Sequence, residues 1–187
     1  MRKIKTKNDI AKEERKNQLI LAIVFISLLV LSTAGYSFAS REDSEDQSIE
    51  TQKYNGITFL KQNDYWTTNL NNQQYTFNYL PNELDNIKIN ITQTLSNYSS
   101  KPLYIVNPNK ESNKLISNLQ SFIQRYQEAS IQPTERNIPI KNCSIDNIII
   151  YTEKNETSIY QKENCIFIEG NFSQATDKFI YNLFEIY

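Results

Sequence analysis

An uncharged apolar run near the N-terminus constrains this chain more than any other feature. No Asp, Glu, Lys or Arg occurs between Lys16 and Arg41, and Leu19 to Ala39 spans 21 residues. As a helix rising 1.5 Å per residue, that segment is about 31 Å long, close to the ~30 Å hydrocarbon core of a bilayer. The run therefore predicts a transmembrane helix over residues 18–39, serving as a single-pass signal anchor.

The charges that flank this run predict its orientation. Residues 1–17 carry seven basic and three acidic side chains, whereas the segment that follows, REDSEDQSIE, is acidic. Because positively charged flanks stay in the cytoplasm, we expect a cytoplasmic basic segment at 1–17 and residues 40–187 outside the cell membrane. Cleavage of a signal peptide after Ala39 is the alternative, since Ser37-Phe38-Ala39 is a small-x-small triplet. The length of the apolar run favours a retained anchor.

The exported part divides into a stalk and a domain. Residues 40–53 are polar, with Ile49 as the only large apolar side chain, which is typical of a flexible stalk. Periodic apolar runs begin after it and predict a folded domain over residues 54–187. From residue 40 onwards, 18 acidic residues outnumber 13 basic ones. This balance argues against a nucleic-acid partner.

The two cysteines, Cys143 and Cys165, flank a stretch rich in β-forming residues. Outside the cytoplasm a structural disulfide is the favoured interpretation, with unpaired buried thiols as the alternative. A thioredoxin-like centre needs a C-x-x-C spacing that this pair lacks. The chain contains no histidine, so a four-ligand zinc site and a histidine-activated cysteine both lack their usual partner. We expect neither a metal nor a cofactor.

Three short runs after Gly56 predict an antiparallel meander. They are GITFLK, YWTTNL and YTFNYL, separated by QND and NNQQ. Tyr75, Phe77 and Tyr79 alternate onto one face, and Asn and Asp at the breaks favour turns. Trp66 in the middle run is interpreted as a core aromatic rather than a ligand platform.

The rest of the domain predicts a βαβ-like unit and a C-terminal helix. PLYIV (102–106) and IIIYTE (148–153) are typical of buried strands, and apolar residues at helical spacing predict a helix over 111–128 between them. This order favours parallel pairing of the two strands. Residues 82–101 predict a loop with a short helix. ETSIYQ and CIFIEG are further strands, and a helix begins near Ser173, its expected N-cap. The fold class is therefore α+β, or α/β, with a mixed sheet.

The residue inventory excludes several chemistries. Without histidine there is no Ser-His-Asp triad and no Cys-His dyad, and three glycines make neither a P-loop nor a dinucleotide fingerprint. A carboxylate pair for glycoside hydrolysis remains open, but solvated surface acids are the favoured interpretation. The candidate acids are Asp64, Glu83, Asp85, Asp146, Glu153, Glu169 and Asp177.

Two surface features stay open at this stage. The twelve tyrosines are compatible with a carbohydrate- or partner-binding surface, although ordinary packing in strands and core is the favoured interpretation. The chain holds 23 Asn, so five N-x-[ST] sequons are close to the number expected by chance, and they leave glycosylation undecided. The sequons begin at Asn90, Asn97, Asn142, Asn155 and Asn171.

Three segments carry a resemblance. LILAIVFISLLVLSTAGYSFA, YNGITF with YWTTNLNNQQYTFNYLP, and NCSIDNIIIY with NCIFIEG and ATDKFIYNLFEI together resemble small membrane-anchored, uncharacterised proteins of archaea with small AT-rich genomes. The resemblance covers most of the exported part. It implies the membrane topology and the pairing of the cysteines, and no catalytic residues.

These observations favour a non-catalytic binding or structural module displayed on a membrane anchor. The alternative is a pilin-like filament subunit, although ERKNQ before the apolar run lacks the small residue typical of a leader-processing site. An exported hydrolase that uses carboxylates is a more distant alternative. The membrane is the one partner that the sequence indicates directly.

Overall fold

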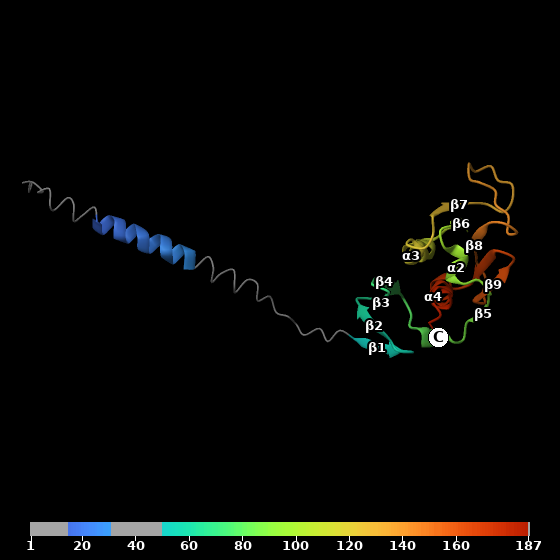
Figure 1. The fold of residues 1–187 in the computed structure, drawn as a ribbon, viewed down its shortest axis with the longest axis horizontal. Coiled ribbons are helices and arrows are strands. Elements are labelled where there is room, and N and C mark those ends of the chain that lie inside the picture. The colour runs from blue at the N-terminus through green and yellow to red at the C-terminus, as the bar shows by residue number, and fades with distance from the viewer. Residues whose placement is uncertain (1–14, 31–49, 187) are drawn as a thin grey trace, which may run out of the picture. The chain divides into compact units, whose positions relative to one another are not determined.

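The computed structural model describes residues 15–30 and 50–186 (Figure 1). The chain divides into two units, Met1–Ser48 and Ile49–Tyr187. Most of the predicted basic segment (1–17) and of the predicted stalk (40–53) lies outside the described residues. So do the predicted membrane segment from residue 31 onwards and the alternative cleavage site after Ala39.

In the N-terminal unit, residues 15–30 form a helix. Its apolar side chains, among them Leu21 and Phe25, are solvent-exposed within this unit. Across residues 15–30 and 50–186, no helix has both the length and the apolar character needed to cross a bilayer.

The second unit begins with a four-stranded antiparallel sheet in the order β1-β2-β3-β4. Its strands are β1 (Thr51–Tyr54), β2 (Ile57–Gln62), β3 (Tyr65–Leu70) and β4 (Gln73–Phe77). The predicted meander is confirmed, and β1 extends it by one strand. The first strand begins at Thr51, so the domain starts earlier than the predicted boundary at Tyr54, and residues 51–53 are not part of a stalk. The signal for β1 was the Asn55-Gly56 turn, where both residues have positive φ (45° and 80°).

The second sheet is mixed and has six strands in the order β5-β9-β10-β8-β6-β7. The strand β6 pairs in parallel with β8, as the sequence predicts for these two apolar runs, and β8 pairs in parallel with β10. The strand β9 is antiparallel to β10. The bounds are β5 (Lys88–Asn90), β6 (Pro102–Val106), β7 (Arg125–Glu128), β8 (Asn147–Thr152), β9 (Ser158–Lys162) and β10 (Cys165–Glu169).

The predicted helix over 111–128 is wrong in its second half. The helix α3 (Lys110–Leu119) ends early, and residues 125–128 form β7, which pairs in parallel with β6. The apolar residues Phe122 and Ile123 continue the helical spacing, but they sit in the turn between α3 and β7. The backbone N–H and C=O groups of residues 125–128 find hydrogen-bond partners at the open edge of β6. This long-range pairing outweighs the helical preference of the local apolar pattern.

The remaining helices are short or terminal. Residues 82–101 hold α2 (Leu95–Tyr98), which confirms a loop with a short helix, together with part of η1 (Pro81–Leu84) and the unpredicted β5. The C-terminal helix α4 (Phe172–Leu183) is confirmed, but its N-cap is Asn171 and not Ser173. The Asn171 side chain accepts hydrogen bonds from the backbone N–H groups of Ser173 and Gln174.

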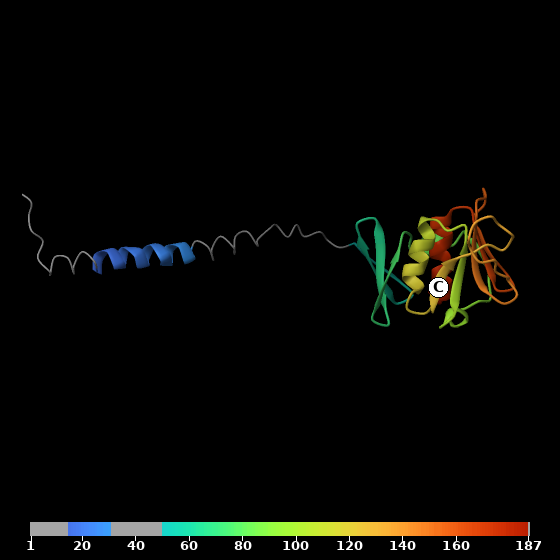
Figure 2. The same ribbon diagram turned by 90° about the horizontal axis from the view of Figure 1, so that it is seen from above.

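The helices α3 and α4 lie between the two sheets, as Figure 2 shows. One core cluster joins both sheets to both helices. It includes Phe59, Trp66, Ile149 and Phe179, so Trp66 is a core aromatic as predicted. A smaller cluster with Tyr104, Ile148 and Cys165 covers the opposite face of the six-stranded sheet.

Candidate functional site

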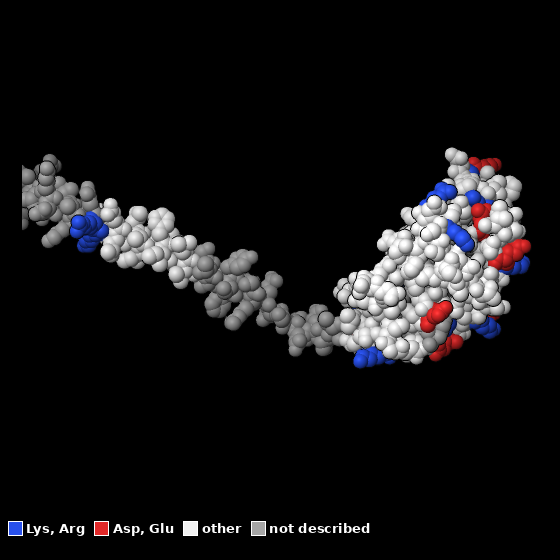
Figure 3. Space-filling view, viewed as in Figure 1, with Lys and Arg blue, Asp and Glu red and all other residues white. Residues whose placement is uncertain are grey.

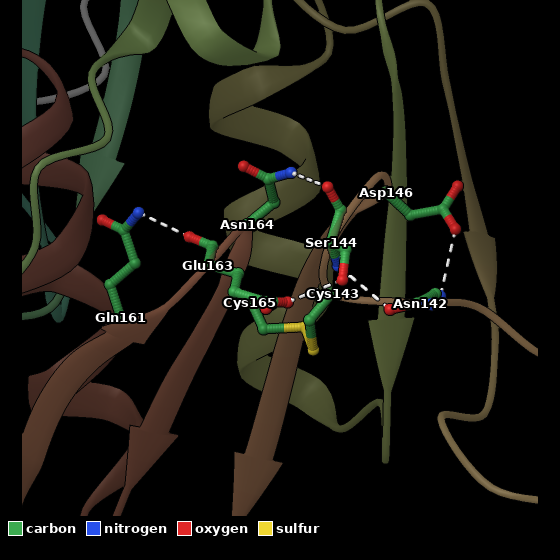
Figure 4. The surroundings of a disulfide bond; sticks show 8 residues. All are labelled: Asn142, Cys143, Ser144, Asp146, Gln161, Glu163, Asn164 and Cys165. Carbon is green, nitrogen blue, oxygen red and sulfur yellow. Dashed lines mark hydrogen bonds between the residues drawn. A yellow bond between two sulfur atoms is a disulfide. The ribbon is translucent and has the colours of Figure 1, made fainter.

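Cys143 and Cys165 form a disulfide with their Cα atoms 5.0 Å apart (Figure 4). Cys165 opens β10 and pairs in register with Ile148, the second residue of β8. The bridge therefore fastens the turn that enters β8 to the start of the neighbouring strand. The disulfide interpretation is confirmed, and the alternative of unpaired thiols is wrong.

Hydrogen bonds fix the turn that carries Cys143. The Cys143 carbonyl accepts the Asn164 N–H at 2.9 Å, and the Ser144 carbonyl accepts from the Asn164 side chain at 3.1 Å. The Asp146 carboxylate accepts the Asn142 N–H at 3.1 Å and lies 3.3 Å from the Lys141 ammonium. The cysteines thus sit in a rigid structural element (Figure 4).

One acid from the sequence set, Asp177, lies in the core in an ionic cluster. Its Oδ1 is 2.7 Å from Lys114 Nζ, which is also 2.9 Å from Glu111 Oε2. Its Oδ2 accepts the N–H groups of Asn78 at 2.7 Å and Tyr79 at 3.1 Å. Burial raises the pKa of Asp177 to about 6, against the opposing effect of Lys114 and the two N–H groups.

This cluster joins three elements far apart in the sequence. Asp177 lies on α4 just past its first turn, Lys114 comes from α3, and Asn78 and Tyr79 follow β4. Sequence reasoning missed Lys114 and Glu111, because nothing in the local pattern indicates a partner some 60 residues away. Asp177 is completely buried, so the cluster locks elements together and is closed to a substrate.

A second acid, Glu169, lies at the end of β10 among polar neighbours. Lys154 Nζ is 2.8 Å from its Oε1, and the hydroxyl groups of Tyr160 and Ser158 donate to its carboxylate at 3.1 and 3.2 Å. Burial by itself raises the pKa of Glu169, but these hydrogen bonds outweigh it, and the pKa lies below its usual value. The carboxylate is thus held in its charged, structural form.

The other candidate acids do not converge on one site. The Glu83 carboxylate accepts the Leu80 N–H at 2.6 Å, and Asp85 lies 3.8 Å from Lys178. Asp64 is exposed in the turn between β2 and β3, and Glu153 is exposed after β8. In residues 15–30 and 50–186, no group of three or more His, Cys, Asp or Glu side chains could hold a metal ion.

The outer face of the meander carries a shallow pocket of about 320 Å³. We call it the meander surface and define it by the six residues that line it. The register places them on one face: Gln62 is opposite Tyr65, and Thr67 is opposite Thr76. The core aromatics Phe59 and Phe77 alternate onto the other face. The six residues are Gln62, Asn63, Tyr65, Thr67, Gln74 and Thr76.

A second pocket, of about 360 Å³, lies at the carboxyl ends of β6 and β8. Asn107 and Asn109 line it from the loop before α3, and Tyr151 and Phe172 meet edge to face beside it. Ligands of open α/β sheets often bind at such strand ends. Here the Asn107 side chain donates to the Tyr151 carbonyl at 3.1 Å, and Asn109 caps α3. The Asn107 amide and the Asn109 Oδ1 therefore already serve the fold, and the Asn109 Nδ2 is buried without a hydrogen-bond partner among the described residues.

Most tyrosines pack as the sequence predicts. The exceptions with large exposed fractions are Tyr65 on the meander surface, at 50%, and Tyr126 on β7, at 58%. The five sequon asparagines are all solvent-exposed, which leaves their modification open. The buried tyrosines are Tyr75, Tyr98, Tyr104, Tyr151 and Tyr181.

Comparisons with known proteins found no matching family model, no matching curated protein and no matching solved structure. Arguments about function therefore depend on the site geometry and on the chemistry of the chain itself.

Proposed function

We propose that the chain is a single-pass membrane protein that displays the folded unit outside the cytoplasm as a non-catalytic binding module. The observation that carries the proposal is the Cys143–Cys165 disulfide. Stable disulfides belong to oxidising compartments, because cytosolic reductants keep thiols reduced. The bridge therefore supports a location of this domain on the outer side of the membrane.

The N-terminal unit supports the anchor. Side chains such as Leu21 and Phe25 of the described helix are exposed, and the uncharged run of the sequence continues from that helix to Ser40. Apolar side chains on every face of a helix require an apolar environment, which a bilayer supplies. The basic residues before the run favour a cytoplasmic N-terminus.

A binding role without catalysis fits the arrangement of acids. Asp177 and Glu111 bind one lysine inside the core, and Glu169 binds Lys154 beside Tyr160. These carboxylates stabilise contacts within the fold, which is the usual role of buried paired charges. The meander surface, in contrast, presents exposed polar side chains such as Gln62 and Gln74 that are open to a partner, although its Thr67 is buried.

Protease treatment of intact cells tests the topology. We expect added protease to remove the folded unit and to spare residues 1–17, detected with antibodies against each end of the chain. Lysed cells serve as the control for cleavability. Full protection of the folded unit in intact cells, with cleavage after lysis, would overturn the proposal.

A further inference from the structure

We propose that the meander surface binds a neutral carbohydrate chain. The inference rests on the proposed binding role and names the ligand class and the residues. It is carried by three properties of one surface: paired hydrogen-bonding side chains, a half-exposed aromatic ring, and the absence of charged side chains from the residues that line it.

The lining side chains can exchange hydrogen bonds with hydroxyl groups. Amides and hydroxyls both donate and accept, as sugar hydroxyls do. Gln62 lies opposite Tyr65, and Gln74 lies two residues before Thr76 on the same face. Within the described part of the chain, Thr67 alone among the six uses its side chain in a hydrogen bond, from Oγ1 to the Leu60 carbonyl at 3.2 Å. The others keep their capacity for a ligand.

The Tyr65 ring supplies the apolar element that sugar recognition needs. A sugar ring presents C–H groups on its faces, and an aromatic side chain offers a flat apolar surface with a polar tip. Tyr65 is 50% exposed at the first position of β3. Its counterparts on the other face of the sheet, Trp66 and Tyr75, are buried in the core, so packing of the core does not require Tyr65.

Charge selects between ligand classes. None of the six lining residues is charged, although charged residues make up 22% of the chain. Figure 3 shows that most charged side chains on this view lie over the rest of the domain, while the region of the meander is white apart from a blue side chain at its lower edge. An acidic polymer needs Lys or Arg partners, whereas a neutral polyhydroxyl chain does not.

The surface is also held in shape before a ligand arrives. The hairpins on either side of β3 close through two-residue turns, in which Asn63, Asn71 and Asn72 take positive φ. The Thr68 hydroxyl donates to the Thr58 carbonyl at 2.8 Å and ties β3 to β2. Preorganisation of this kind reduces the entropy lost on binding.

The test uses the full-length protein in lipid nanodiscs and isothermal titration with soluble oligosaccharides. The neutral probes are hexaoses of glucose, mannose and N-acetylglucosamine, and the charged probes are oligogalacturonate and a sulfated oligosaccharide. We expect at least one neutral hexaose to bind. Tyr65→Ala should raise its Kd about tenfold, and Gln74→Ala about fivefold.

Tyr126→Ala is the matched control, because Tyr126 is a similarly exposed tyrosine on the other sheet; it should leave the Kd unchanged. If Tyr65→Ala lowers the melting temperature strongly, the Gln74→Ala result decides. Lack of binding by every neutral probe, an unchanged Kd in both meander variants, or tighter binding of an acidic probe would overturn the inference. The titration uses purified protein, so its failure would leave the protease result on topology intact.

Discussion

The side-chain amide of Asn118 takes the place of a neighbouring strand beside Thr76. Its Oδ1 accepts the Thr76 N–H at 3.2 Å, and its Nδ2 donates to the Thr76 carbonyl at 3.0 Å. Thr76 lies on β4, the last strand of the meander, and Asn118 comes from α3. One helix residue thus satisfies the open edge of the sheet, where unpaired backbone groups would invite another chain.

Replacing Asn118 with Ala should therefore destabilise the folded unit. Two partly buried backbone groups of Thr76 lose their partner, which costs about 1–3 kcal/mol of unfolding free energy. Urea denaturation measures this loss. Asn113→Ala is the control, because Asn113 is exposed on the same helix and should change stability little. Equal stability of the two variants would contradict the role of Asn118.

Asp177 should make stability depend on pH in a specific direction. Its pKa is about 6 in the folded protein against a usual value of 3.8, so the folded state holds this proton more tightly than the unfolded state. The resulting stabilisation is complete below pH 3.8 and is lost as the pH rises through about 6. A shift of roughly two units corresponds to about 3 kcal/mol.

Asp177→Asn isolates this effect because the amide does not titrate. The unfolding free energy of the wild type minus that of the variant should fall by about 2 kcal/mol between pH 4 and pH 7, most of the full effect. The contributions of other acids to the pH dependence of the unfolding free energy cancel in this difference. They include that of Glu169, whose pKa is lowered. A difference that stays constant or rises with pH would show that the pKa of Asp177 is not raised.

Gly170, between β10 and α4, should tolerate no side chain. Its φ is +79°, and a Cβ atom would lie 2.6 Å from the Glu156 carbonyl oxygen and 2.7 Å from the Thr157 Cα. Gly170→Ala should cost about 3 kcal/mol of unfolding free energy, from backbone strain and this clash together.

Gly56→Ala is the matched control for Gly170. Gly56 has nearly the same φ, +80°, but a Cβ there meets no atom within 4 Å. Only the conformational cost remains, about 1 kcal/mol. Thermal or urea melts of both variants separate the two terms, and similar losses would contradict a steric role for the Glu156 carbonyl.

The disulfide should contribute to stability and not to binding. The bridge spans a sequence separation of 22 residues, for which loop-closure entropy predicts a loss of about 3 kcal/mol in the Cys143→Ser/Cys165→Ser double variant. Its carbohydrate affinity, measured on the fraction that remains folded, should match that of the wild type. An unchanged unfolding free energy would show that the bridge does not stabilise the domain.

The local pattern of apolar residues predicts those strands that are buried on both faces. The apolar runs of β6 and β8 are recognisable because both faces of these strands are covered. In contrast, β7 is a polar edge strand, and its four residues, RYQE, take this form only because β6 lies beside them. The first strand was missed although Asn55-Gly56 marks a hairpin, because the polar residues before it match a stalk equally well.

The site residues were harder to predict for a related reason. In a chain with 23 Asn, nothing distinguishes Asn118, which closes a sheet edge, from asparagines on the surface. The ion pair between Lys114 and Asp177 depends on how α3 and α4 pack, and no local sequence pattern indicates this packing. Cys143 and Cys165 were predictable as a pair because the chain has no other cysteine and its apolar N-terminal run predicts export.

The central claim, display outside the cytoplasm, is tested most directly by the redox state of the cysteines in protein taken from cells. Cells are quenched in acid, free thiols are alkylated, and peptides of the full-length protein are analysed by mass spectrometry without reduction. We predict a peptide that links Cys143 to Cys165, with neither cysteine carrying the alkyl label. Alkylation of both cysteines in the bulk of the protein would place the domain in a reducing compartment and contradict the account.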